Sequence, residues 1–234
     1  LAQFALARQQ RCTARLHLEG ALRVVDLVEP GVGGLGVTAL VGGLREHQPG
    51  LGLATVAAAA YDAAHAHPDA DVRKQNQAFY EFMVPLIKGY STEMSLDVAS
   101  LGVQVHGGMG FIEETGAAQY LRDAKILTIY EGTTAIQAND LVGRKTARDG
   151  GRTAKAIAAQ IEVTETRLAA SNDVAAQSMF KRLRAAREAF VEVVDFVAAQ
   201  SKTNPNAVFA GSVTYLLLAG RVVVQFGRHR LLLQ

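Results

Sequence analysis

Helical periodicity is the feature that most constrains the fold of this 234-residue chain. Beyond residue 50, apolar side chains recur every three or four positions, which is the spacing of a helix with one buried face. The clearest example is the apolar set of residues 86–105: Leu86, Ile87, Tyr90, Met94, Val98, Leu101 and Val105. No stretch beyond residue 50 alternates apolar and polar residues as a half-exposed strand does. The sequence therefore predicts an all-α fold, a helical bundle.

Capping residues and chain breaks predict where the helices begin and end. An alanine-rich helix is predicted over residues 51–65, ended by Pro68, and either Asp69 or Asp71 is expected to cap the helix that follows. The other predicted helices cover residues 115–126, 134–146, 153–170 and 175–200, and a final apolar helix begins at residue 207, after the break in "SKTNPN". Thr115 and Thr133 are the expected caps of the first two of these helices.

The first 50 residues are rich in glycine and have no clear period. Gly31, Gly33 and Gly36 have the G-x-G-x-x-G spacing of a dinucleotide-binding turn. Pro30 interrupts the approach, however, and no acidic residue follows a strand about 20 positions later. Residues 1–50 are therefore unassigned, and they are either foreign to the rest of the chain or disordered.

Composition narrows the class of protein. Charged residues make up 20% of the chain and the formal net charge is +2, so the overall charge does not indicate nucleic-acid binding. Cys12 is the only cysteine, which excludes an internal disulfide and favours a reducing compartment such as the cytoplasm. The apolar run 207–220 contains Ser212 and Thr214 and is followed by Arg221, so a core or interface helix is expected rather than a membrane span.

Four motifs between residues 100 and 145 carry the functional information: "QVHGGMGF", "LRDAKI", "IYEGTTAIQ" and "NDLVGRK". In this order and spacing they resemble the C-terminal helical domain of the acyl-CoA dehydrogenases. The likeness extends back to residue 51 and forward through "NPNAVFAGSVTYLLLAG", which resembles the C-terminal extension of larger bacterial members, including those acting on methylmercaptopropionyl-CoA. It implies a C-terminal helical domain over 51–150 and an extension over 151–234. The family's N-terminal helical domain and middle β-domain are not recognisable, so the chain is expected to be a fragment.

The resemblance implies a reaction and a base. The family uses FAD to convert an acyl-CoA thioester to a trans-2-enoyl-CoA, and Glu131 matches the carboxylate that accepts the α-proton while a hydride passes to flavin N5. Burial would raise the pKa of such a glutamate towards working pH. Gly132 would let the backbone approach the thioester carbonyl, where negative charge develops. Without the resemblance, Glu131 is better explained as a surface carboxylate before a helix N-terminus, which the macrodipole favours.

Other residues match the family's cofactor contacts. Gln104, Gly107, Gly108 and Gly110 resemble the turn that reaches a neighbouring subunit's FAD, although a helix C-cap would also explain the glycines. Thr133 and Gln137 resemble cofactor contacts at a helix start, with plain capping as the alternative. Position 135 departs from the family, because it is Ala where many members have a polar residue.

The resemblance also implies a structural pair and a set of partners. Arg122 and Asp123 are expected to position the loop that carries the base. The implied partners are an acyl-CoA substrate, a homo-oligomer (dimer or tetramer) and an electron-transfer flavoprotein or similar acceptor. No metal site is expected, because His65 and His67 point to different faces of a helix end.

Two other functions are compatible with the sequence. The chain could be a catalytically silent helical oligomerisation module. It could also be a nucleic-acid-associated relative, supported only by these basic residues of the helix predicted over 175–200: Lys181, Arg182, Arg184 and Arg187.

Overall fold

The computed structural model describes residues 52–232, and the side chains of residues 52–226. Helices and turns account for this part of the chain, and it contains no strand, which confirms the all-α prediction. Its residues fall into two compact units: 91–133 belong to the first, and 52–90 with 134–232 to the second. The glycine pattern at Gly31, Gly33 and Gly36 and the cysteine at position 12 lie outside the described residues.

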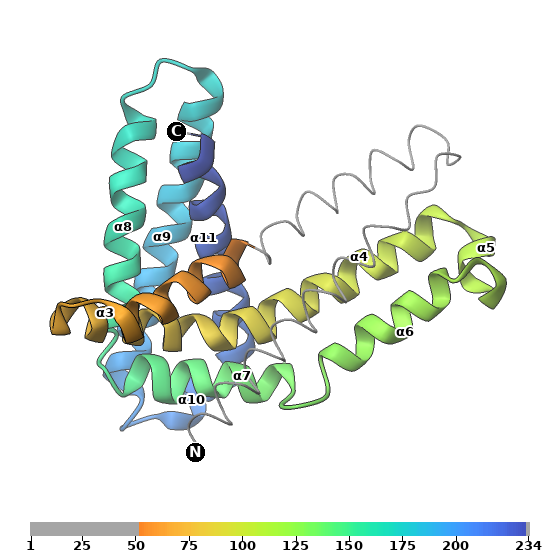
Figure 1. The fold of residues 1–234 in the computed structure, drawn as a ribbon, viewed down its shortest axis with the longest axis horizontal. Helices are drawn as coiled ribbons and strands as arrows, with labels where there is room; N and C mark the ends of the chain where they lie inside the picture. The colour runs from red at the N-terminus through yellow and green to blue at the C-terminus, as the bar shows by residue number, and fades with distance from the viewer. Residues whose placement is uncertain (1–51, 233–234) are drawn as a thin grey trace. The chain divides into compact units, whose positions relative to one another are not determined.

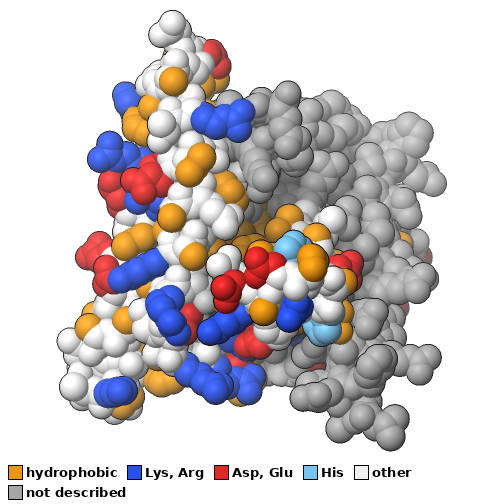
Figure 2. Space-filling model, turned by 60° about the vertical axis from the view of Figure 1, so that its left-hand side comes forward, with side chains coloured by type: hydrophobic (Ala, Val, Ile, Leu, Met, Phe, Trp, Pro, Cys, Tyr) orange, Lys and Arg blue, Asp and Glu red, His pale blue; other side chains and the backbone are white. Residues whose placement is uncertain are grey.

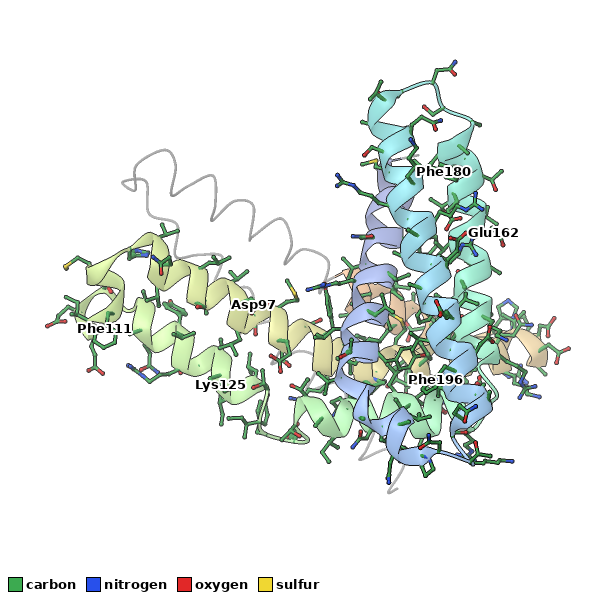
Figure 3. All side chains as sticks on the ribbon, turned by 180° about the vertical axis from the view of Figure 1, so that it is seen from behind. Asp97, Phe111, Lys125, Glu162, Phe180 and Phe196 are labelled. Atoms are coloured by element: carbon green, nitrogen blue, oxygen red, sulfur yellow. The ribbon has the colours of Figure 1, made fainter. Side chains whose placement is uncertain are left out.

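The first unit is built on a pair of helices. It contains α4 (Ser91–Val105), α5 (Gly108–Phe111), the short 3₁₀ turn η2 (Glu113–Thr115) and α6 (Ala117–Leu127). Figure 1 shows α4 and α6 side by side, with α5 at the end where the chain turns back. Small and β-branched side chains are buried on the two helices, namely Val98 and Ala99 on α4 and Ala117 and Ala124 on α6. At the turn, the Phe111 side chain is 81% exposed (Figure 3).

The start of α6 corrects one prediction. Thr115 does not cap this helix, because its Oγ1 donates to the carbonyl oxygens of Met109 (2.8 Å) and Ile112 (3.2 Å) instead. The N-cap is Gly116, which has φ 76° and so occupies the left-handed region that glycine adopts without a steric penalty. Threonine is a common N-cap residue, but here its hydroxyl is hydrogen-bonded to carbonyl oxygens of the turn that precedes the helix.

The second unit contains the remaining helices. Their bounds are 52–66, α3 (Ala70–Pro85), the π-helical segment η1 (Leu86–Tyr90), α7 (Thr134–Asp140), the π-helical segment η3 (Leu141–Ala147), α8 (Arg152–Ala169), α9 (Val174–Gln200), α10 (Pro205–Ala210) and α11 (Ser212–Leu232). Figure 1 shows α8, α9 and α11 packed lengthwise beside one another. Asp69 caps α3, as predicted, by accepting from the backbone N–H of Asp71 at 2.8 Å.

The helix predicted over 86–105 does not begin at residue 86. Residues 70–105 are helical without a break, and η1 forms the π-helical part of that run. Pro85 directly precedes η1. Proline often kinks or ends a helix, but here the chain remains helical through η1.

The core of the second unit is apolar and is shared among several helices. Its largest fully buried side chains include Phe82 and Met83 of α3, Leu86 of η1, Leu141 of η3, Ile161 of α8, Leu183 and Phe190 of α9, and Leu216 of α11. On α9 the buried apolar side chains are Leu183, Phe190, Val194 and Val197, which lie three, four or seven positions apart as on one face of a helix, whereas Phe180 is half-buried. None of the helices in residues 52–232 combines the length and the apolar content that crossing a membrane requires.

Close packing of α11 on η1 depends on a glycine. A Cβ atom at Gly220 would collide with the ring of Tyr90, lying 2.5 Å from Cδ2 and 2.8 Å from Cβ. Tyr90 is itself buried, so its ring has little room to move aside.

We therefore expect Gly220→Ala to lower the free energy of unfolding by about 1–3 kcal/mol, the usual cost of overpacking a well-packed core. Urea unfolding followed by circular dichroism measures the change. Gly102→Ala in α4 is the control, because a Cβ there meets no atom within 4 Å, and alanine in a helix should stabilise by about 0.5–1 kcal/mol. Equal effects of both substitutions would contradict the packing argument.

Candidate functional site

The turn after α6 is tightly hydrogen-bonded. Thr128 is buried, and its Oγ1 donates to the Lys125 carbonyl oxygen at 3.0 Å. The backbone N–H groups of Ile129 and Tyr130 both donate to the Ile126 carbonyl, at 3.0 and 3.1 Å. These bonds continue the winding of α6 for one further turn and fix the point at which the chain leaves it.

Glu131 follows this turn in a strained conformation. Its φ is 53°, and no other non-glycine residue of the described chain has a positive φ. Gly132 follows with φ 100°, so two successive residues leave the right-handed region before α7 begins. A non-glycine residue held there costs of order 1–3 kcal/mol, and such residues cluster at functional sites.

The surroundings of Glu131 differ from the buried environment that the resemblance implies. Glu131 is exposed, so the described chain does not itself supply the walls of a dry site. Its neighbour Tyr130 is half-buried, and burial together with the nearby Glu131 charge raises the pKa of the Tyr130 phenol. The strained turn is thus present, but the described residues do not enclose the Glu131 side chain.

Backbone conformation or close packing explains two of the three glycines at the end of α4. Gly107 has φ 60°, which favours glycine. A Cβ at Gly110 would overlap the Val103 carbonyl oxygen, so close packing explains that position. Gly108 has neither reason, because its φ is not positive and a Cβ there would meet no atom within 4 Å. His106, which directly follows α4, is hydrogen-bonded to that helix: its Nδ1 lies 2.8 Å from the Gly102 carbonyl oxygen.

The candidate residues fall into separate groups. Gln104, Gly107 and Gly108 are exposed at the α5 end of the α4–α6 pair, and Glu131, Gly132 and Thr133 follow α6 at the other end (Figure 1). The 11 residues of α6 correspond to about 16 Å at 1.5 Å per residue. The structure therefore does not bring the two groups together within one chain.

Gln137 belongs to the second unit, on α7, and is half-buried. A Cβ built on Gly89 of η1 would lie 3.3 Å from the Gln137 Cβ, so the two backbones are close. Nothing in the sequence pattern relates position 89 to position 137, and this contact was not predicted.

Arg122 and Asp123 are linked through a third residue. Gln119 accepts from Arg122 at 2.7 Å and donates to Asp123 Oδ1 at 2.7 Å, all on α6. Arg122 also forms an ion pair with Glu113 at 3.3 Å. These contacts stabilise α6 and the η2 turn, and a role of the pair in positioning the Glu131 loop stays a prediction.

A groove in the second unit was also not predicted. It has a volume of about 790 Å³ and is lined by residues of helix 52–66, α3 and α8, among them Val56, Ala60, Lys74, Phe79, Arg152 and Ile157. None of the predicted site residues lines it. Within the described residues, no group of three or more His, Cys, Asp or Glu side chains could hold a metal ion.

Two family models match consecutive parts of the chain. Residues 51–146 match the acyl-CoA dehydrogenase C-terminal domain, and residues 153–226 match a family described as acetyl-CoA dehydrogenase C-terminal like. The solved structure of Bd2924 in its apo form is similar with a TM-score of 0.59 at 17% identity, over 93% of this chain and 39% of that one. At this identity the structural likeness concerns the fold.

Sequence relatives agree with these matches. The 3-methylmercaptopropionyl-CoA dehydrogenase of Ruegeria pomeroyi is 54% identical over 156 residues, which are 67% of this chain and 26% of that protein. The broad-specificity linear acyl-CoA dehydrogenase FadE5 of Mycobacterium tuberculosis is 32% identical over 152 residues, or 62% of this chain and 24% of that protein. A butyryl-CoA dehydrogenase of Syntrophomonas wolfei is 33% identical over 144 residues, or 61% and 23%.

The chain spans about a quarter of the length of these relatives. Its fold, its consecutive family matches and its relatives lead to one assignment. The chain belongs to the acyl-CoA dehydrogenase family, of which it carries the C-terminal helical domain followed by the C-terminal extension.

Proposed function

We propose that this chain supplies the catalytic base and part of the cofactor site of a FAD-dependent acyl-CoA dehydrogenase. The observation that carries the proposal is the strained Glu131–Gly132 turn within the family motif "IYEGTTAIQ". The substrate is an acyl-CoA thioester and the product a trans-2-enoyl-CoA. The name of the Ruegeria pomeroyi relative makes 3-methylmercaptopropionyl-CoA the first substrate to test.

Proton abstraction is the step that Glu131 performs. Its carboxylate accepts the α-proton, and the electron pair of that C–H bond moves into the new carbon–carbon double bond as the β-hydrogen departs with its own pair. A backbone amide at Glu131 or Gly132 donates to the thioester carbonyl oxygen, where charge develops. The absence of a Cβ at Gly132 allows this close approach. The rest of the protein must cover the exposed carboxylate and exclude water.

FAD, when bound, supplies the acceptor for the β-hydrogen, which is transferred as hydride. The residues present fit such a group at Gly107 and Gly108, because a Cβ at either position would meet no atom within 4 Å and the backbone is open to an incoming molecule. Gln104 is exposed in the preceding turn of α4 and can donate or accept hydrogen bonds there. Thr133 and Gln137 are the proposed contacts near the start of α7.

The separation of the candidate groups supports a homo-oligomer. One chain places Gly107 and Gly108 at one end of the α4–α6 pair and Glu131 at the other end (Figure 1). If the α5 end of one copy meets the Glu131 end of another copy, the two groups line one site although about 16 Å of α6 separates them within a chain. We therefore propose that each cofactor contacts two copies of the chain, in a dimer or tetramer. An electron-transfer flavoprotein or similar acceptor would then reoxidise the flavin.

Flavin binding and turnover test the proposal in a complete enzyme. The test uses a chimera in which residues 52–226 of this chain replace the matching part of the Ruegeria pomeroyi dehydrogenase. The same chimera serves for the later tests of FAD binding and turnover. We expect it to purify with visible flavin absorbance and to oxidise 3-methylmercaptopropionyl-CoA or butyryl-CoA. A folded chimera that stays colourless after FAD is added would instead support the silent oligomerisation module.

Gly108→Ala in the chimera separates ligand contact from folding. A methyl group added to a packed contact costs about 1–3 kcal/mol, so we expect FAD binding to weaken by about 5- to 150-fold while the unfolding temperature is unchanged. Titration of the apoprotein with FAD measures the effect. Gly102→Ala is the matched control and should not alter FAD affinity. If Gly108→Ala binds FAD as tightly as the unsubstituted chimera, this turn is not a flavin contact.

The basic cluster on α9 gives little support to nucleic-acid binding. Arg187 pairs with Glu165 at 2.7 Å and Arg184 pairs with Glu188 at 2.8 Å, so two of its four cations are engaged within the protein. On the face shown in Figure 2, Lys and Arg side chains are interspersed with Asp and Glu. Binding to phosphates usually requires a contiguous basic surface.

A further inference from the structure

We infer that the C-terminal extension positions Gln137, with α11 acting through the glycine contacts of η1. This inference rests on the proposed function, because Gln137 is there a proposed cofactor contact. It gives the extension a role in the cofactor site, although no candidate site residue belongs to the extension itself.

Gly89 lies at the centre of the contact. A Cβ atom on Gly89 would be 2.8 and 3.0 Å from the two methyl carbons of Leu216 and 3.3 Å from the Cβ of Gln137. Leu216 of α11 and Gln137 of α7 therefore both lie around the point where a side chain at residue 89 would begin. Real Cβ atoms almost never approach other atoms within 3.0 Å, so only glycine fits here without a shift of its neighbours.

Two further contacts fix α11 in place. Gly220, one turn after Leu216, packs directly against the ring of Tyr90 in η1. Tyr215 OH and Thr146 Oγ1 lie 2.9 Å apart, both buried, and this hydrogen bond joins α11 to η3, the continuation of α7. Because α11 contacts both η1 and η3, these contacts oppose a movement of α11 away from Gly89.

The consequence is a direct mechanical link to Gln137. The Leu216 side chain has an exposed fraction of 0%, so the surrounding core limits its rotation when a neighbour grows. A methyl group added at Gly89 therefore requires Leu216 to move and also presses on Gln137, which must give by a few tenths of an ångström. π-helical segments such as η1 are frequent at functional sites, and here the segment brings its backbone against a residue assigned to the cofactor.

A double-mutant cycle in the chimera tests this link. FAD dissociation constants are measured for Gly89→Ala, Gln137→Ala and the double variant, with unfolding temperatures as the folding control. We expect each single substitution to weaken FAD binding by at least about fivefold, and the double variant to be no weaker than the weaker single variant, since coupled residues are non-additive. Adding Leu216→Val to Gly89→Ala makes room for the methyl group and should restore affinity to within about twofold.

Several results would overturn the inference. Unchanged FAD affinity in Gly89→Ala would do so, as would a double variant whose loss is the product of the two single losses. If Gly89→Ala does not fold, Leu216→Ala is titrated instead, and unchanged affinity there has the same meaning. The proposed function is tested separately by turnover of the unsubstituted chimera: an active chimera that is insensitive to Gly89→Ala refutes only this inference, and an inactive, flavin-free chimera refutes both.

Discussion

Replacing Glu131 by glutamine is expected to lower turnover of an acyl-CoA by about 10²–10⁴-fold, the range that a positioned general base contributes. An amide cannot accept the α-proton, whereas the shape of the side chain is nearly unchanged. Binding of FAD and of substrate should therefore be retained. Steady-state kinetics of the chimera, with the FAD content of each preparation as a check, give the result.

Glu114→Gln provides the matched control for this substitution. Glu114 is another exposed glutamate of the same unit, but it lies in the η2 turn at the opposite end of the α4–α6 pair. Its replacement should leave turnover within about twofold, because surface substitutions away from special features usually have small effects. Equal losses in both variants, or none in Glu131→Gln, would show that another residue is the base.

Arg187→Ala is expected to have the largest effect on stability. Its guanidinium forms two hydrogen bonds to Glu165, at 2.7 and 3.0 Å, and Glu165 is only 3% exposed. Hydrogen bonding to Glu165 raises the pKa of Arg187. Removing the arginine leaves a buried carboxylate without its partner, which costs about 3–5 kcal/mol. Urea unfolding of this chain, followed by circular dichroism, measures the loss.

The neighbouring pair Arg184–Glu188 gives the comparison. It also lies on α9 and has a similar separation of 2.8 Å, but both side chains are more than half exposed. Exposed pairs contribute about 0–1 kcal/mol, so Arg184→Ala should have a much smaller effect. Replacing both Glu165 and Arg187 by methionine should destabilise less than Arg187→Ala alone. If the double variant is as unstable as the single one, the loss does not come from an unpaired buried charge.

Periodicity was sufficient to predict the helices, because the buried faces of α9 and α11 have the spacing of a single apolar stripe. Residue type alone predicted the helix caps less well. Asp69 caps α3 as its residue type suggested, but the Thr115 hydroxyl bonds to the turn before α6. Whether a hydroxyl accepts from the N–H groups of the following helix or donates to carbonyl oxygens of the preceding turn depends on the three-dimensional path of the turn, and this is not encoded in the spacing.

The candidate site was predictable only as a set of residues. The motif identified Glu131, but not its positive φ or its exposure, since both depend on tertiary structure. The contact of Gly89 with Leu216 and Gln137 joins positions far apart in the sequence. A glycine selected by such a contact cannot be distinguished, from one sequence, from a glycine that merely occupies a helix.

Reduction of the bound flavin in a single turnover tests the central claim most directly. The chimera is mixed with excess acyl-CoA in the absence of oxygen and of any electron acceptor, and the visible flavin absorbance is followed. With Glu131 present the absorbance should fall rapidly, while in Glu131→Gln it should persist even though substrate is bound. If the Glu131→Gln flavin is bleached at the rate of the unsubstituted chimera, the carboxylate of Glu131 does not take the proton.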